Sequence, residues 1–117
     1  MKKIYQESRP WGKFLRFTNN EKSTVKIIEV HPGGKLSLQS HRYRSEHWYI
    51  LQGNPILVIG KSSKKYKPGS SAFIKKGVKH RVSNPGKGKV RILEISTGRF
   101  DEKDIVRYED KYNRLVR

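Results

Sequence analysis

The chain has 117 residues without a cysteine, and its 27 Lys and Arg against 10 Asp and Glu give a formal net charge of +17. The absence of cysteine excludes disulfides, thiolate metal sites and a cysteine nucleophile. The length fits one domain spanning residues 1–117. No stretch approaches the roughly 20 apolar residues of a membrane span, and the first residues lack the apolar segment of a signal peptide, so we expect a cytoplasmic protein that does not contact a membrane.

Short runs rich in Val, Ile, Tyr and Phe alternate with Gly, Pro, Asn and Ser along most of the chain. This pattern is typical of short strands separated by turns. It predicts seven strands, at Phe14–Phe17, Thr24–Val30, Glu46–Leu51, Ile56–Ile59, Ser71–Ile74, His80–Ser83 and Val90–Ser96. The segment Asp101–Arg114 mixes charged and apolar residues differently, as in a short helix or an ordered tail. The sequence therefore predicts an all-β fold, a small β-barrel or jelly roll.

Polar residues that suit a metal ion occur in two separate segments. The first segment contains Gln39, His41 and Glu46, and the second contains His80, three residues after Gly77. Residues two apart in a strand project from the same face, so Gln39 and His41 point the same way, and a turn lets Glu46 face them from the next strand. Two imidazoles, a carboxylate and an amide oxygen suit Zn²⁺, Mn²⁺, Fe²⁺, Co²⁺ or Ni²⁺ and leave positions open for substrate.

The two segments resemble the paired motifs of the cupin superfamily, with Gln39 at the place of the usual first histidine and Lys75 at that of a common proline. LSLQSHRYRSEHWYILQG (Leu36–Gly53) is similar to type II phosphomannose isomerase, which often forms the C-terminal half of bifunctional mannose-1-phosphate guanylyltransferases. Similar segments follow in the same order at Arg9–Phe14, Val25–His41, Gly77–Lys87 and Asp104–Arg114.

This resemblance implies a single-domain cupin that interconverts mannose 6-phosphate and fructose 6-phosphate with a divalent metal ion, most simply zinc. It places the metal on Gln39, His41, Glu46 and His80. It also implies a homodimer, because cupins commonly pair through sheet edges. No guanylyltransferase domain precedes the cupin motifs in this sequence, so we expect a stand-alone isomerase domain.

The isomerisation needs a residue that carries a proton between C2 and C1 of the sugar. Glu94 is the first candidate, because it is a lone carboxylate within the apolar run Val90–Ile95. Arg107 is the second, since its segment is similar to one that supplies an active-site arginine in type I phosphomannose isomerases. His47 is the third, although a regular strand points it away from the face of Glu46. A surface position for Glu94 and a structural ion pair for Arg107 remain equally open.

A sugar phosphate also needs cations, and guanidinium groups bind phosphate in a fixed orientation. Five basic residues of the family-like segments are candidates, namely Arg9, Lys13, Arg44, Arg81 and Lys111. Their spacing does not rank them, and each one taken alone is more simply explained as a surface cation than as a phosphate ligand.

Three other functions stay open at this point. A non-catalytic sugar-binding cupin would keep the fold and the metal. Another sugar-phosphate or nucleotide-sugar enzyme would keep the fold and change the substrate. A nucleic-acid-binding β-barrel is favoured by the net charge alone. The basic residues are spread in small groups without a recognisable nucleic-acid motif, so we do not expect a nucleic-acid partner.

Overall fold

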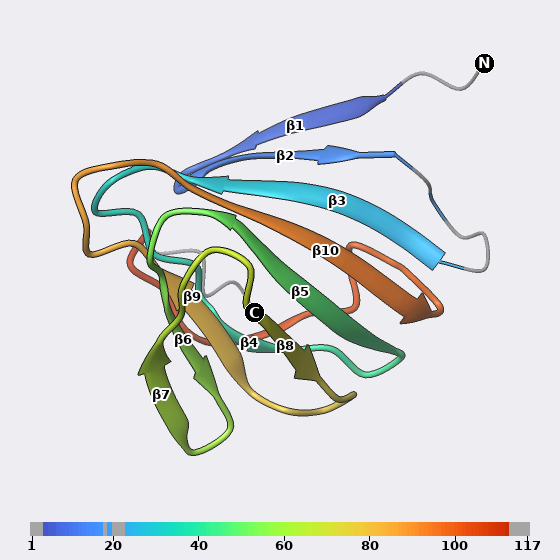
Figure 1. Cartoon of the computed structure of the whole chain (residues 1–117). Coiled ribbons are helices and arrows are strands. Elements are labelled where there is room, and N and C mark those ends of the chain that lie inside the picture. Colours follow the sequence, from blue (N-terminus) through green and yellow to red (C-terminus); the bar gives the residue numbers. More distant parts are fainter. Residues whose placement is uncertain (1–3, 18, 20–22, 113–117) are drawn as a thin grey trace.

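In the computed structural model, which describes residues 4–17, 19 and 23–112, two antiparallel sheets face each other (Figure 1). The larger sheet has the order β1-β2-β3-β10-β5-β8, formed by Tyr5–Arg9, Gly12–Arg16, Ser23–Val30, Val90–Gly98, Arg44–Gln52 and Ser71–Ile74. The smaller sheet has the order β11-β4-β9-β6-β7, formed by Val106–Glu109, Leu38–Ser40, His80–Ser83, Ile56–Ile59 and Ser62–Lys65. The described part of the chain contains strands and no helix, which confirms the all-β fold predicted from the sequence.

Each of the seven predicted strands overlaps an observed one, at β2, β3, β5, β6, β8, β9 and β10. The prediction missed β1, β4, β7 and β11, which are short and polar. All four residues of β7, for example, are exposed. Such strands carry little periodic apolar signal and form because a neighbouring strand offers its backbone groups. A partner strand, and not the local sequence, therefore decides these four elements.

Of the two alternatives predicted for Asp101–Arg114, the short helix is wrong for the described residues. This segment forms a turn at Glu102–Lys103 and then strand β11, which pairs with β4 and sets Arg107 opposite Gln39. Asn113 and Arg114 lie outside the described residues. The mixed charges reflect a strand with one side toward the interior and the other toward solvent.

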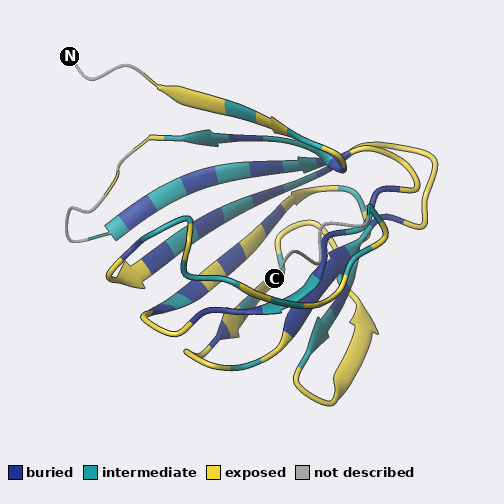
Figure 2. Ribbon diagram, turned by 180° about the vertical axis from the view of Figure 1, so that it is seen from behind, coloured by how far each residue is buried: buried dark blue, intermediate teal, exposed yellow. Residues whose placement is uncertain are grey.

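Buried and more exposed residues alternate along the three long strands β3, β5 and β10 (Figure 2). The buried side chains change character midway along each strand. We call one end of the interior the apolar half, formed by Ile28, Val30, Trp48, Ile50, Val90 and Ile92. We call the other end the polar half, formed by Thr24, Lys26, Arg44, Glu46, Glu94 and Ser96.

Strand register places residues of like character beside one another. In the apolar half, Ile92 is paired with Ile28 on one side and Ile50 on the other. In the polar half, Ser96 is paired with Thr24 and Glu46 in the same way. Antiparallel partners project from the same face, so the fold gathers polar side chains from distant parts of the chain at one end of its interior.

The described residues include no helix with the length and apolar character needed to span a membrane.

Candidate metal centre

Three potential metal ligands converge inside the polar half. His41 follows β4, Glu46 lies on β5 and His80 begins β9, and one ligand atom from each lies within 4.8 Å of the others. The Nε2 atoms of His41 and His80 are 3.6 Å and 3.5 Å from the two carboxylate oxygens of Glu46. All three side chains are buried.

Backbone carbonyls fix the tautomers of both histidines. The Nδ1 atom of His41 is 2.7 Å from the carbonyl oxygen of Asp104, and that of His80 is 2.9 Å from the carbonyl oxygen of Val78. A carbonyl can only accept, so each Nδ1 carries a hydrogen, which leaves Nε2 as the ring atom that can bind a metal. Hydrogen bonds of this kind orient metal-binding histidines in proteins.

The electrostatic surroundings keep His41 in the neutral form that binds metals. Burial lowers the pKa of His41 to about 3, and the positive charge of Arg44 and the neighbouring His80 act in the same direction. The hydrogen bond to Asp104 and the negative charge of Glu94 oppose this shift without overcoming it. The ring is therefore uncharged at neutral pH, as metal ligation requires.

Two atoms of this group are buried without a hydrogen-bond partner, namely Oε1 of Glu46 and Nε2 of His80. Buried polar atoms nearly always have a partner in folded proteins. A divalent cation between them would satisfy both atoms, and a carboxylate with two neutral imidazoles is a common donor set for such ions. His41, Glu46 and His80 can therefore hold a metal ion.

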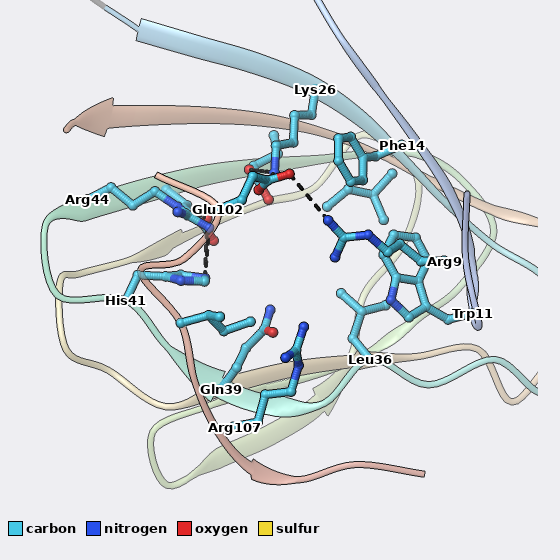
Figure 3. A pocket seen from close by; sticks show the side chains of 14 residues that line it. Arg9, Trp11, Phe14, Lys26, Leu36, Gln39, His41, Arg44, Glu102 and Arg107 are labelled. Carbon is cyan, nitrogen blue, oxygen red and sulfur yellow. Dashed lines mark hydrogen bonds and ion pairs between the residues drawn. The ribbon is translucent and has the colours of Figure 1, made fainter. Parts of the chain in front are cut away.

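Gln39 and Arg44 adjoin this group. Gln39 lies opposite His80 in the pairing of β4 with β9, and its side chain lines the same pocket as His41 (Figure 3). Its Oε1 accepts a hydrogen bond from Ser37 at 2.8 Å. Arg44 donates from Nε to Glu46 at 3.0 Å and from Nη2 to Nε2 of His41 at 3.2 Å. Arg44 thus provides the positive charge that balances the buried Glu46.

The polar half opens into a pocket between the two sheets (Figure 3). Four cationic side chains line it, namely Arg9, Lys26, Arg44 and Arg107, together with three carboxylates, Glu46, Glu94 and Glu102. Apolar side chains complete the wall, among them Trp11, Phe14 and Leu36. A small ligand with both hydroxyl and anionic groups would find suitable partners in this space.

The structure places the three acid–base candidates differently. Glu94 is buried in this pocket, where Ser96 donates a hydrogen bond to it at 3.1 Å and Nζ of Lys26 lies 3.9 Å away. Arg107 reaches the pocket from β11 of the smaller sheet. His47 lies on the exposed outer face of β5, where its ring is 4.6 Å from that of Phe73. His47 is therefore outside the pocket, as strand alternation requires.

The five phosphate candidates also divide. Arg9 and Arg44 line the pocket, whereas Lys13 lies 3.9 Å from Glu29 between β2 and β3 and does not line it. Arg81 bonds to the carbonyl of Leu36 and to Glu109. Lys111 donates to the carbonyl of Gly33 at 2.6 Å. Arg81 and Lys111 line another hollow at the surface, where they join chain segments to one another.

Three residues of the site were not singled out from the sequence. Lys26 carried the same signal as Glu94, a charge at an inward position of an apolar strand, and the two residues are partners in the register of β3 with β10. Asp104 had no local signal, yet its carboxylate accepts hydrogen bonds from the backbone N–H groups of Arg42 and Tyr43 at 2.8 Å and 2.9 Å. Glu102 lies in a turn, where spacing carries no directional information.

Glycines allow the loop that bears His41 to approach its neighbours. Gly77 has a φ of +80°, and its N–H donates to the carbonyl of His41 at 2.8 Å. Gly98 has a φ of +105°, and any side chain there would overlap the carbonyl oxygen of Tyr43. Glycine adopts such conformations without the strain that other residues incur, so both positions help to hold His41 in place.

The fold and the site together define a cupin, in which two antiparallel sheets enclose a pocket with histidine and carboxylate ligands. Residues 1–110 match the family described as "Mannose-6-phosphate isomerase C-terminal". The chain belongs to this family.

Curated relatives agree with this assignment. The chain is 39% identical over 114 residues to the xanthan biosynthesis protein XanB of Xanthomonas campestris. The aligned region covers 97% of this chain and 24% of the relative. It is 38% identical over 108 residues to the mannose-1-phosphate guanylyltransferase ManC of Salmonella typhimurium, covering 92% of this chain and 22% of the relative. The chain thus spans about a quarter of the length of these relatives.

Solved structures support the fold. The capsular polysaccharide assembling protein CapF of Staphylococcus aureus superposes with a TM-score of 0.78 at 16% identity, over 94% of this chain and 35% of that one. A double-stranded β-helix domain protein of Klebsiella pneumoniae superposes with a TM-score of 0.71 at 18% identity, over 82% and 83% of the two chains. At these identities the similarity defines the architecture.

Proposed function

We propose that the protein is a metal-dependent aldose–ketose isomerase that interconverts mannose 6-phosphate and fructose 6-phosphate. One structural observation carries this proposal. A buried group of metal-binding residues, His41, Glu46 and His80, adjoins a pocket that also contains the buried carboxylate of Glu94 and several cations. Membership of a family named after this isomerase and the presence of a mannose-1-phosphate guanylyltransferase among the relatives support the choice of substrate.

We assign Gln39 as the fourth ligand beside His41, Glu46 and His80, with zinc as the expected metal. Gln39 faces the pocket from the strand position opposite His80. A divalent ion held there supplies a Lewis acid that polarises the substrate carbonyl and its neighbouring hydroxyl. The fixed tautomers of the two histidines reduce the reorganisation that ligation requires.

Glu94 is assigned as the residue that moves the proton. As a base, its carboxylate takes the proton from C2 of mannose 6-phosphate, and the resulting acid returns it to C1, while the hydroxyl proton of O2 passes to O1. Ser96 and Lys26 hold this carboxylate at one oxygen, Oε2. Arg107 faces the same pocket from the opposite sheet and is assigned to stabilise negative charge on the substrate oxygens.

The first test is a coupled assay that follows fructose 6-phosphate formation from mannose 6-phosphate, with and without a chelator. His41→Ala and His80→Ala should each lower metal content and turnover together, because each removes a ligand. His31→Ala is the matched control, since His31 is an exposed histidine outside the pocket. Undiminished metal in both ligand variants would contradict the site. Binding of mannose 6-phosphate without turnover would favour a sugar-binding cupin.

We also propose that two copies form a homodimer. Several large apolar residues of β5 and β8 are exposed on the outer face of the larger sheet, namely Tyr49, Leu51 and Phe73. Strand β8 is moreover an edge strand of that sheet. Sedimentation equilibrium should give twice the chain mass of 13.7 kDa. Phe73→Asp should shift the equilibrium toward the monomer, and a monomeric wild-type protein would contradict the proposal.

A further inference from the structure

Glu102 differs from the other two carboxylates of the pocket in the structural element that carries it and in its exposure to solvent. Glu46 and Glu94 lie on β-strands, and their side chains are 2% and 5% exposed. Glu102 lies in the turn after β10, and its side chain is 35% exposed. Its two oxygens contact two cations, Nη2 of Arg9 at 3.3 Å and Nζ of Lys26 at 3.5 Å. A partly exposed acid thus covers a pair of pocket cations.

Both cations have other contacts that hold them. The ammonium group of Lys26 lies between two aromatic rings, 4.5 Å from the centre of Phe14 and 4.3 Å from that of Phe100. The guanidinium of Arg9 lies 5.0 Å from the centre of the Phe14 ring and also contacts Glu7. Aromatic faces attract cations. Arg9 and Lys26 therefore keep their positions when Glu102 turns away.

The turn that carries Glu102 is fixed on both sides. The carbonyl oxygen of Asp101 accepts a hydrogen bond from Nη1 of Arg44 at 3.2 Å. On the other side, the carboxylate of Asp104 bonds to the backbone of the His41 loop. Rotation of the Glu102 side chain can therefore expose the two cations without movement of the backbone.

We propose that Arg9 and Lys26 form the subsite for the phosphate group of the ligand, and that Glu102 occupies this subsite until the phosphate displaces it. The identity of the ligand as a sugar phosphate rests on the proposed function. Four cationic residues and three carboxylates line the pocket, so displacement of Glu102 leaves two carboxylates against four cations among the lining residues. A phosphate monoester carries about −1.5 to −2 charges at neutral pH and can replace the displaced carboxylate on Arg9 and Lys26.

Glu102 also acts in selectivity. A neutral sugar offers no charge to replace the Glu102 carboxylate on Arg9 and Lys26, so it must compete with two ion pairs. A phosphate replaces the same contacts with stronger, doubly charged ones. The internal carboxylate therefore lowers the affinity for unphosphorylated sugars more than that for phosphorylated ones, because only a phosphate can replace both ion pairs.

The test compares Glu102→Gln with Glu109→Gln in calorimetric titrations of the metal-free protein with inorganic phosphate. Glu109 is the matched control, because it is an exposed glutamate paired with Arg81 outside the pocket. Glu102→Gln should bind phosphate about five- to tenfold more tightly than wild type, the size expected for removal of two partly exposed ion pairs. Glu109→Gln should stay within about twofold of wild type.

A second substitution locates the subsite. Adding Lys26→Met or Arg9→Gln to Glu102→Gln should abolish the gain in phosphate affinity. Methionine suits the space between Phe14 and Phe100, and Arg9 is partly exposed, so Arg9→Gln tests the subsite if Lys26→Met does not fold. Equal phosphate affinities of Glu102→Gln and Glu109→Gln would overturn the inference, as would a gain that survives both added substitutions.

The outcomes also separate this inference from the proposed function. Tighter phosphate binding by Glu102→Gln without any isomerisation of mannose 6-phosphate leaves the anion subsite standing and contradicts the isomerase. Isomerisation by the wild-type protein, with KM for mannose 6-phosphate and phosphate affinity unchanged in Glu102→Gln, contradicts the subsite alone.

Discussion

The apolar half and the polar half of the interior are built on the same three strands, yet the first forms the hydrophobic core and the second forms the pocket. In the apolar half, side chains such as Ile28, Ile50 and Ile92 are buried together. Burial of each such side chain contributes about 1.5–3 kcal/mol to folding. In the polar half the same alternation buries charged groups, which lose hydration. The comparison shows that strand geometry sets which side chains are buried, whereas residue type decides whether burial stabilises the fold or prepares a site.

The polar half compensates for burial by pairing its charges. Lys26 lies 3.9 Å from Glu94, and Arg44 lies 3.0 Å from Glu46. Buried pairs of this kind add little net stability, while removal of one partner leaves an uncompensated charge. We therefore expect substitutions in the apolar half to reduce stability, and those in the polar half to reduce binding or catalysis and also stability where they leave a buried charge without its partner.

The largest expected effect is on catalysis and comes from Glu94→Gln. Glutamine keeps the shape of the side chain and removes the proton acceptor, so turnover should fall roughly 10²–10⁴-fold. Metal content should hardly change, because Glu94 is not among the assigned ligands. Lys26 keeps Glu102 as a partner, so the protein should stay folded. Near-normal turnover of mannose 6-phosphate would assign proton transfer to another residue of the pocket.

Ile92→Ala should have the opposite effect, a loss of stability without a loss of metal binding. Ile92 is fully buried between Ile28 and Ile50 of the neighbouring strands. Loss of its side chain leaves a cavity and should lower the free energy of unfolding by about 2–4 kcal/mol in urea titrations. The folded fraction should bind metal as the wild type does. A variant that unfolds normally but loses its metal would show that the two halves are not separable.

The pH dependence of stability should reveal the buried His41. Its pKa is near 6.5 when unfolded and about 3 when folded, so below pH 6.5 the unfolded chain binds a proton that the folded chain excludes. The free energy of unfolding of the metal-free protein should therefore fall with decreasing pH, by up to about 1.4 kcal/mol per unit from this group. His41→Gln should reduce the slope between pH 6.5 and 5, whereas the exposed His31→Gln should not. Equal slopes in all three proteins would contradict burial of a neutral His41.

Asp104 affects the pH dependence of stability in a lower pH range than His41 does. Burial opposes its ionisation, but hydrogen bonds from the backbone of Arg42 and Tyr43, together with the charge of Arg44, lower its pKa below 3.8. Its contribution to stability is complete above that value and disappears as the pH falls through the folded pKa. Measurements between pH 6.5 and 5 thus separate the effect of His41 from that of Asp104.

The smallest effect is expected from Gln39→Ala. A neutral amide oxygen is the weakest of the four assigned ligands, so metal affinity should fall less than in His80→Ala. Competition titrations with a chromogenic chelator can rank the two variants. A loss of affinity in Gln39→Ala equal to that in His80→Ala would make Gln39 a full member of the ligand set.

Local sequence determined much of this protein. Alternating apolar residues and regularly spaced turns identified the seven main strands, because successive side chains of a strand point to opposite faces and every second residue is buried. The spacing of Gln39, His41 and Glu46 around a turn, with His80 in a second segment, indicated where a metal could bind. The inward carboxylate Glu94 was recognisable for the same reason, and Lys26 carried an equal signal.

Tertiary structure alone decided the rest. The polar strands β1, β4, β7 and β11 form through backbone pairing with neighbours, which local composition does not encode. Among the five cationic candidates, the fold brought Arg9 and Arg44 to the pocket and used Arg81 and Lys111 to join chain segments. Glu102 and Asp104 acquired their roles from a turn that folds over the pocket. Long-range packing determines where a loop side chain points, whereas strand alternation is a property of the sequence itself.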